Sequence, residues 1–173
     1  SYYVSNNQDS ALVYANQAVK LNDKDGYGYF LKGKILMEQQ KYELAITELD
    51  KAATLNPDGS GIYEKRGFSK LMLEQYEEAI KDFNTLIKLE PEYHIAYNNR
   101  GYCTMMLKEY AKALPDFDKA IALRSDYSTA YNNKAYANFK MGKKEEACKD
   151  WQKASAMGNQ DANNFVESYC KSM

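Results

Sequence analysis

Apolar residues along this chain are spaced as on the buried faces of short amphipathic helices, and these segments come in pairs. The segment 95–107 places Tyr97 and Gly101 four residues apart on one face. The segment 110–123 carries a second stripe, formed by Ala113, Phe117 and Ala120. Because residues at i, i+4 and i+7 share one side of a helix, each segment predicts a helix with one buried face. Gly and Ala at the crossing would let the two backbones approach closely.

The pattern recurs every 34 residues along the chain. The heptad AYNNRGY at 96–102 is followed by AYNNKAY at 130–136. The other positions that keep this step are Ala11, Ala45, Ala79, Ala113 and Ala147, then Tyr29, Tyr63, Tyr97 and Tyr131, then Gly33, Gly67, Gly101 and Ala135. Pro57 and Pro91 lie one period apart after the second helix of their units, where proline ends a helix without removing an internal hydrogen bond. A fixed period of this length indicates stacked units of two helices.

These residues resemble the tetratricopeptide repeat (TPR), and the chain is similar to bacterial members of that family. The resemblance implies an all-α fold, a right-handed α-solenoid of helix–turn–helix repeats. It covers residues 1–173 as a single domain, made of a partial repeat (1–25), four full repeats (26–59, 60–93, 94–127 and 128–161) and a C-terminal capping helix (161–171). The residues that depart from the family pattern, Ser125, Ala135 and Lys144, lie in the last two full repeats. A terminal repeat meets a different neighbour, so departures are expected there.

The two ends of the chain carry different signals. Residues 161–171 predict an amphipathic helix whose apolar face is formed by Ala162, Phe165, Val166, Tyr169 and Cys170. Asn159 and Asp161 are the candidate N-caps of this helix. At the other end, SYYVS (1–5) is interpreted as the last turn of a first helix whose start is missing, which would leave apolar surface exposed.

Composition narrows the classes of function. Of the 173 residues, 45% are hydrophobic and 27% charged, and the net charge is −1, which gives no reason to expect nucleic-acid binding. No apolar run is long enough to predict membrane insertion. His94 is the only histidine, so neither a Cys/His metal site nor a cofactor is expected. The carboxylates of 74–82 and 143–150 lie among lysines at helix starts and are interpreted as a solvated face rather than acid/base pairs, so no enzyme is predicted.

Two of the three cysteines form a candidate disulfide. Cys148 and Cys170 are equally far from residue 159, the expected turn between the last two helices. Residues equidistant from the turn of an antiparallel hairpin lie at the same height, although a bond also requires Cα atoms within about 7 Å. A disulfide would imply an oxidising compartment and favours the periplasm or cell envelope, whereas the alternative is a pair of packed thiols. Cys103 is expected to be a buried small residue.

The family resemblance implies that the first helices of the repeats line a concave groove. The side chains expected to bind a peptide there are Lys65, Phe68, Met72, Asn98, Asn99, Tyr102, Met106, Asn132, Asn133 and Tyr136. An amide both donates and accepts hydrogen bonds, so a row of asparagines can hold the backbone of an extended peptide whatever its sequence. Tyrosine supplies rigid contact area and methionine adaptable contact area. The asparagine pairs resemble the asparagine ladder of O-GlcNAc transferases, which holds peptide backbone.

The predicted function is a protein–protein interaction scaffold that binds an extended peptide or partner segment in its groove. The Lys and Asn pattern of the carboxylate clamp in chaperone adaptors is missing, so binding to chaperone tails is not predicted. Two alternatives stay open. The asparagines and tyrosines belong only to the consensus of the helix, or the incomplete N-terminal end stacks on another chain or on upstream repeats and gives homo-oligomers. The identity of the partner does not follow from an architecture.

Overall fold

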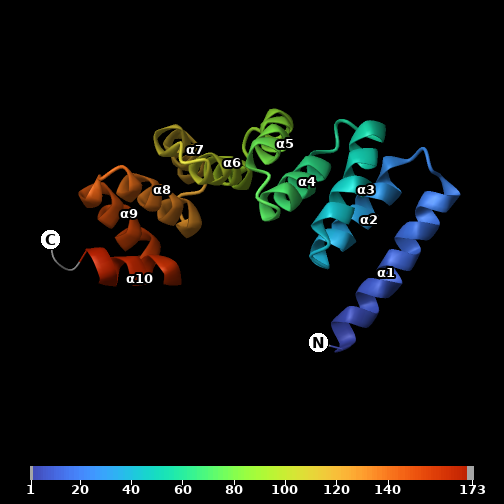
Figure 1. Ribbon diagram of the computed structural model, residues 1–173, viewed down its shortest axis with the longest axis horizontal. Helices are drawn as coiled ribbons and strands as arrows, with labels where there is room; N and C mark the ends of the chain where they lie inside the picture. The colour runs from blue at the N-terminus through green and yellow to red at the C-terminus, as the bar shows by residue number, and fades with distance from the viewer. Residues whose placement is uncertain (1, 171–173) are drawn as a thin grey trace. The chain divides into compact units, whose positions relative to one another are not determined.

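In the computed structural model, every regular element of the described residues is an α-helix (Figure 1). The structure describes the backbone of residues 2–170 and the side chains of residues 11–170. The ten helices of this part are α1 (Tyr2–Leu21), α2 (Gly26–Glu38), α3 (Tyr42–Leu55), α4 (Ser60–Met72), α5 (Tyr76–Leu89), α6 (His94–Met106), α7 (Tyr110–Leu123), α8 (Ser128–Lys140), α9 (Lys144–Ala156) and α10 (Gln160–Tyr169).

The helical hairpins expected from the 34-residue period are confirmed. Within each full repeat the first helix packs against the second, which pairs α2 with α3, α4 with α5, α6 with α7 and α8 with α9. The predicted helix over 110–123 coincides with α7, and the one over 95–107 is shifted by one residue in α6. The apolar periodicity therefore locates these helices nearly to the residue.

The chain divides into two compact units, Ser1–Glu90 and Pro91–Met173. The sequence alone groups the same residues into one domain, and the boundary between the units falls near the junction of the second and third full repeats. Each unit has its own buried core and is described by itself.

The first unit contains α1 to α5. Its core is formed by Leu36, Ala45, Leu49, Ala52 and Ile62, with Leu12 of α1 packed against this cluster. α1 contacts α2 and exposes large apolar side chains, with Val13 55%, Tyr14 70% and Leu21 87% exposed. These side chains belong to the surface that the self-assembly alternative would use.

The interpretation of SYYVS is wrong in one respect. α1 is a continuous helix over Tyr2–Leu21, so residues 2–5 do not form the last turn of a separate helix. Residues 1–25 contain neither glycine nor proline, and nothing in the sequence interrupts the helix there. The side chains of residues 1–10 lie outside the described residues, as does their expected exposure.

The second unit contains α6 to α10 and is built around aromatic side chains. Phe117 and Trp151 are fully buried in neighbouring clusters. The ring of Trp151 stacks on Phe165 of α10, with ring centroids 4.7 Å apart and an interplanar angle of 9°. The helix predicted over 161–171 is α10, and Asn159 is its N-cap because the Asn159 Oδ1 accepts a hydrogen bond from Ala162 N at 2.9 Å. α10 thus covers the aromatic end of the α8–α9 hairpin.

Small residues at the helix crossings are required by the packing. A Cβ added at Gly33 would lie 2.5 Å from Leu49 Cγ, and one added at Gly101 would lie 2.9 Å from Phe117 Cε1. No carbon atom can approach another so closely without displacing it. The repeated glycine therefore sets how near the two helices of a repeat can come.

Candidate functional site

The asparagine pairs of the second unit connect α6 to α8. Asn133 Nδ2 donates a hydrogen bond to Asn98 Oδ1 at 3.0 Å, and Asn98 Nδ2 donates to Asn99 Oδ1 at 3.3 Å. Asn98 is 3% exposed and Asn133 8% exposed. Because each satisfies the other, these two amides have a structural use within the unit, holding neighbouring first helices together.

The other member of each pair is more accessible. Asn99 and Asn132 are half-buried. The Asn132 Oδ1 is itself buried and has no hydrogen-bond partner among the described residues. A buried acceptor without a donor costs about 1–3 kcal/mol, and an incoming N–H could reach this oxygen only if the Asn132 side chain turned toward the surface. One half-buried amide on each helix thus reaches the surface of the unit.

Aromatic and sulfur-containing side chains lie on the same two helices. Tyr102 and Tyr136 are half-buried and pack against the core, whereas Met106 is 40% exposed. The ring of Tyr136 meets Phe165 edge-on at a centroid distance of 6.2 Å, and Lys140 Nζ lies 5.2 Å from the Tyr136 centroid. These contacts hold Tyr136 in place, which reduces the entropy that binding would remove.

The remaining predicted site residues lie on α4 of the first unit. Phe68 is 37% exposed and Met72 45% exposed. Lys65 Nζ is paired with the Glu64 carboxylate on the same helix at 3.0 Å. This surface is apolar with internally matched charge, and it belongs to a different unit from the α6–α8 surface.

A series of ion pairs that was not predicted from the sequence recurs with the repeat. In each full repeat a cation seven positions into the first helix meets a carboxylate 16 residues later in the second helix. The pairs are Lys32–Glu48 at 3.0 Å, Arg66–Asp82, Arg100–Asp116 and Lys134–Asp150 at 3.6 Å. The 34-residue step of these charges was present in the sequence and could have been found by testing polar as well as apolar series.

These pairs correct the interpretation of the acidic segments. Asp82 is 2% exposed and Asp150 7% exposed, so the last carboxylate of each segment is buried between helices rather than solvated. Asp82 binds both Arg66 and Lys70, the latter at 2.8 Å. Glu77 and Glu78 do lie in the first turn of α5 and are exposed, as expected for a dipole-matched helix start.

Burial and ion pairing shift the pKa values of these side chains in opposite directions. Burial works to lower the pKa of Arg66, but hydrogen bonds and charge from Asp82 and Asp50 outweigh it, so the pKa is raised. Burial raises the pKa of Asp150, and Lys134 offsets this only in part. The charges are therefore those of a packed interior, where each carboxylate has a cationic partner.

The repeated tyrosines also make hydrogen bonds within their own unit. Tyr63 Oη donates to Pro57 O at 2.9 Å, and Tyr97 Oη donates to Pro91 O at 3.0 Å. The guanidinium of Arg100 lies 5.6 Å from the Tyr97 ring centroid. Each tyrosine thus ties its helix to the preceding turn, which explains its recurrence without a ligand.

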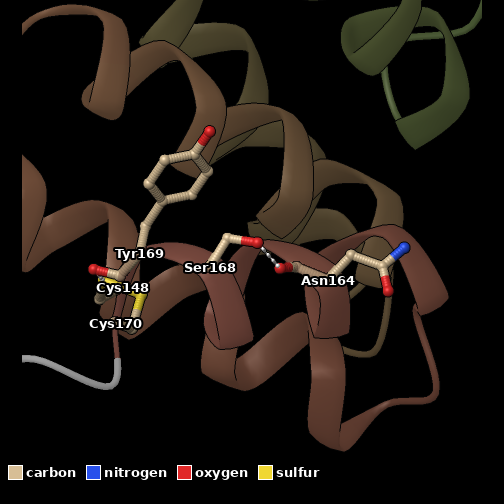
Figure 2. The surroundings of a disulfide bond; sticks show 5 residues. All are labelled: Cys148, Asn164, Ser168, Tyr169 and Cys170. Atoms are coloured by element: carbon tan, nitrogen blue, oxygen red, sulfur yellow. Dashed lines mark hydrogen bonds between the residues drawn. A yellow bond between two sulfur atoms is a disulfide. The ribbon is translucent and has the colours of Figure 1, made fainter.

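A disulfide links Cys148 of α9 to Cys170 at the end of α10, with a Cα–Cα distance of 5.7 Å (Figure 2). Nearby on α10, Ser168 Oγ donates to the carbonyl oxygen of Asn164 at 2.8 Å. The third cysteine, Cys103, is free and buried, and burial raises the pKa of its thiol to about 12. A thiol with such a pKa is unreactive at neutral pH.

The described residues offer no metal site and no membrane-spanning helix. The described residues contain no group of three or more His, Cys, Asp or Glu side chains arranged to hold a metal ion. His94 lies at the start of α6, edge-on to Tyr127 with ring centroids 4.9 Å apart. None of the described helices combines the length and apolar content needed to cross a bilayer.

Comparison with known proteins identifies the class of fold. A tetratricopeptide repeat family model matches residues 67–128 and 107–163, and a second TPR model matches residues 33–74. A search by sequence among curated proteins finds no match. The chain belongs to the tetratricopeptide repeat family.

Several solved structures share this fold. A crystal structure of MamA superposes with a TM-score of 0.84 at 23% identity, covering 93% of this chain and 94% of that one. MamA from Desulfovibrio magneticus RS-1 gives 0.83 at 20% identity, covering 89% and 88%. YrrB, described as a TPR protein with an unusual peptide-binding site, gives 0.83 at 17% identity, covering 95% and 86%. At these identities the likeness shows the fold alone, an all-α solenoid of TPR hairpins.

Proposed function

We propose that this chain is a protein-interaction module that binds an extended segment of a partner protein on the α6–α8 face. The TPR fold supports a role in protein–protein interaction, and the finer assignment rests on one observation. Asn99 and Asn132 are half-buried on neighbouring helices, and Asn99 uses only its Oδ1, which accepts from Asn98, whereas Asn98 and Asn133 are buried and hydrogen-bonded to each other. Peptide binding described for YrrB gives this proposal a precedent in the fold.

The binding mode follows from the side chains. The Asn99 and Asn132 amides would pair with backbone N–H and C=O groups of an extended segment, which requires no particular sequence. Tyr102, Tyr136 and Met106 would contact its side chains, with Met106 adapting to their shape. Affinity would come from the aromatic contacts and orientation from the amides.

A photo-crosslinking amino acid at Met106 tests where the partner lies. Met157 is the matched control, since it is similarly exposed at 41% but lies at the end of α9. We expect a partner segment from the native host to be captured from position 106 and not from position 157. Capture from both positions, or from neither, would contradict binding at this face.

Titration calorimetry with the captured segment, made as a synthetic peptide, tests the amides. The double change Asn99→Ala and Asn132→Ala should weaken binding about thirtyfold, because it removes two net hydrogen bonds of about 1 kcal/mol each. Asn164→Ala, at an exposed position of α10, is the control. Asn98→Ala is unsuitable because it also removes the hydrogen bond from Asn133. Unchanged affinity in the double variant would rule out the proposed use of the amides.

A further inference from the structure

The first unit contains a cavity that neither the repeat packing nor the proposed function uses. Its volume is about 280 Å³, and it lies between the start of α2, the α3–α4 loop and the start of α4. Its apolar wall is formed by Tyr27, Phe30 and Ile62, and Asp58 lies in the loop at its edge.

This cavity depends on a missing side chain. Gly61 occupies the position that Ile95 and Thr129 occupy in the next two repeats. A Cβ added at Gly61 would lie 3.4 Å from Phe30 Cζ, which is ordinary contact, so a side chain fits there but would fill the space. The chain therefore keeps an opening at one repeat that the following repeats do not have the residues to form.

The lining combines aromatic rings with a carboxylate. Tyr27 is 60% exposed, and its ring centroid lies 6.4 Å from that of Phe30. Asp58 is exposed and makes no side-chain hydrogen bond or ion pair with any described residue. Asp25, by contrast, is engaged as the N-cap of α2, accepting from Tyr27 N at 3.0 Å. The cavity thus offers two π faces and one unengaged negative charge.

Elsewhere in this chain, an aromatic ring and a carboxylate are both contacted by an arginine of the chain itself. Arg100 lies over the Tyr97 ring and forms hydrogen bonds to Asp116, with Nε at 2.8 Å from the carboxylate. Arg66 does the same with Tyr63 and Asp82. No cation of the described residues lies over the ring of Tyr27 or Phe30. The cavity therefore has the aromatic rings and the carboxylate of such an arrangement, but no cation.

We propose that the cavity binds an arginine side chain of a partner protein, with the guanidinium against Tyr27 and Phe30 and ion-paired to Asp58. A guanidinium suits this lining better than an ammonium because it is planar and weakly hydrated, stacks on aromatic rings and pairs with a carboxylate through two hydrogen bonds. The site lies wholly within the first unit, so it stands or falls independently of peptide binding on α6 and α8.

Amide NMR spectra of the full chain, titrated with short peptides, test this ligand class. The probes are Ac-Ala-Arg-Ala-NH2, the same peptide with uncharged citrulline, and the same peptide with leucine. We expect the arginine peptide to shift the amide signals of Gly59 and Gly61 in a saturable way, and the citrulline and leucine peptides to bind at least fivefold more weakly. Equal or stronger binding of the leucine peptide, or no saturable shift with arginine, would overturn the proposal.

Two variants separate the parts of the site. Asp58→Asn should lower affinity for the arginine peptide at least fivefold, while Glu92→Gln, at the equivalent exposed turn of the next repeat, should leave it unchanged. Gly61→Ile should abolish binding without lowering the melting temperature, because isoleucine occupies the same place in α6. Full binding by either Asp58→Asn or Gly61→Ile would show that the peptide binds elsewhere.

Discussion

At the turn between the two helices of each repeat, one residue adopts a left-handed backbone conformation. The residues and their φ angles are Gln40 at 59°, Glu74 at 58°, Lys108 at 64° and Gly142 at 79°. They lie one period apart, yet only the last is glycine, the residue that adopts this conformation without steric cost. Because three of the four lack glycine, the sequence offers no local signal for this feature, and the fold imposes it.

Replacing Lys108 with glycine should stabilise the protein. The left-handed conformation costs a lysine about 1–2 kcal/mol, so Lys108→Gly should raise the free energy of unfolding by about 0.5–1 kcal/mol after the greater flexibility of the unfolded chain is subtracted. Urea denaturation measures the change. Gly142→Lys, the reverse change at the equivalent turn, should be destabilising by a similar amount. A loss of stability in Lys108→Gly would contradict this account.

His94 should make stability depend on pH. Burial and the positive charge of Arg124 lower its pKa below the ordinary value of 6.5, although Asp126 acts in the opposite direction. The unfolded chain therefore binds a proton more readily, and this contribution to stability, complete above about pH 6.5, is lost as the pH falls through the pKa of the folded state. Thermal unfolding between pH 5 and 8 should show a flatter profile in His94→Gln. Parallel profiles in the two proteins would rule out His94 as the source.

Within each repeat, the apolar contacts between the two helices could be predicted from the sequence, whereas the ion pairs between the same helices could not. The apolar period predicted where the helices begin and end, since buried side chains must recur on one side. The charges between the helices were not predicted, because Asp82 and Asp150 stand in acidic segments that look like solvated helix starts. Only the packing of the first helix on the second shows that the last carboxylate of each segment is enclosed.

The need for glycine at the helix crossing can be measured, because the fourth repeat has alanine at the equivalent position. Gly101→Ala would place a methyl group 2.9 Å from Phe117 Cε1 and 3.0 Å from Asp116 Cβ, and should lower the free energy of unfolding by about 1–3 kcal/mol. The fourth repeat already holds Ala135, fully buried beside Trp151. Ala135→Gly should also be destabilising, by about 1 kcal/mol, because it removes a packed methyl group from a helix. Chemical denaturation of both variants decides, and a stabilised Gly101→Ala protein would contradict the close approach.

The repeated ion pairs should differ in strength. Asp82→Asn leaves both Arg66 and Lys70 without their shared carboxylate and should cost about 3–5 kcal/mol, as for the loss of one partner in a buried pair. Asp150→Asn should cost clearly less, because burial already raises the pKa of Asp150 and Lys134 stands 3.6 Å away. Guanidinium denaturation of the two variants side by side measures the difference. Equal losses would mean that the second cation on Asp82 adds nothing.

At the scale of the whole molecule, the first and last helices differ in how much apolar surface they leave exposed. α10 closes the second unit with an aromatic face and a disulfide, while α1 leaves Val13, Tyr14 and Leu21 exposed. The symmetry of Cys148 and Cys170 about residue 159 showed that the two cysteines would lie at one height. Whether their side chains face each other depends on the rotation of α10 about its own axis relative to α9. The packing of Trp151 against Phe165 fixes that rotation.

Loss of the disulfide should loosen the end of the second unit. The cysteines are 22 residues apart, and closing a loop of that size contributes about 3 kcal/mol. Reductant should therefore lower the melting temperature of the native protein but not that of Cys170→Ser. Thiol titration of the denatured, unreduced protein should find one free thiol, that of Cys103. Three free thiols would show that the bond does not form.

The sequence by itself determined the helices, their pairing and the period of the stack, because each repeat must present the same small and apolar side chains to its neighbour. It also marked the side chains from which a binding face could be built. Which of those side chains remain accessible was decided only by the tertiary structure. In the sequence Asn98 and Asn133 cannot be distinguished from Asn99 and Asn132, but the packing of α6 against α8 brings the first two into a buried hydrogen bond and leaves the others half-buried at the surface. The cavity at Gly61 is likewise a consequence of packing, since a missing side chain becomes a binding site only where aromatic residues from another helix surround the space.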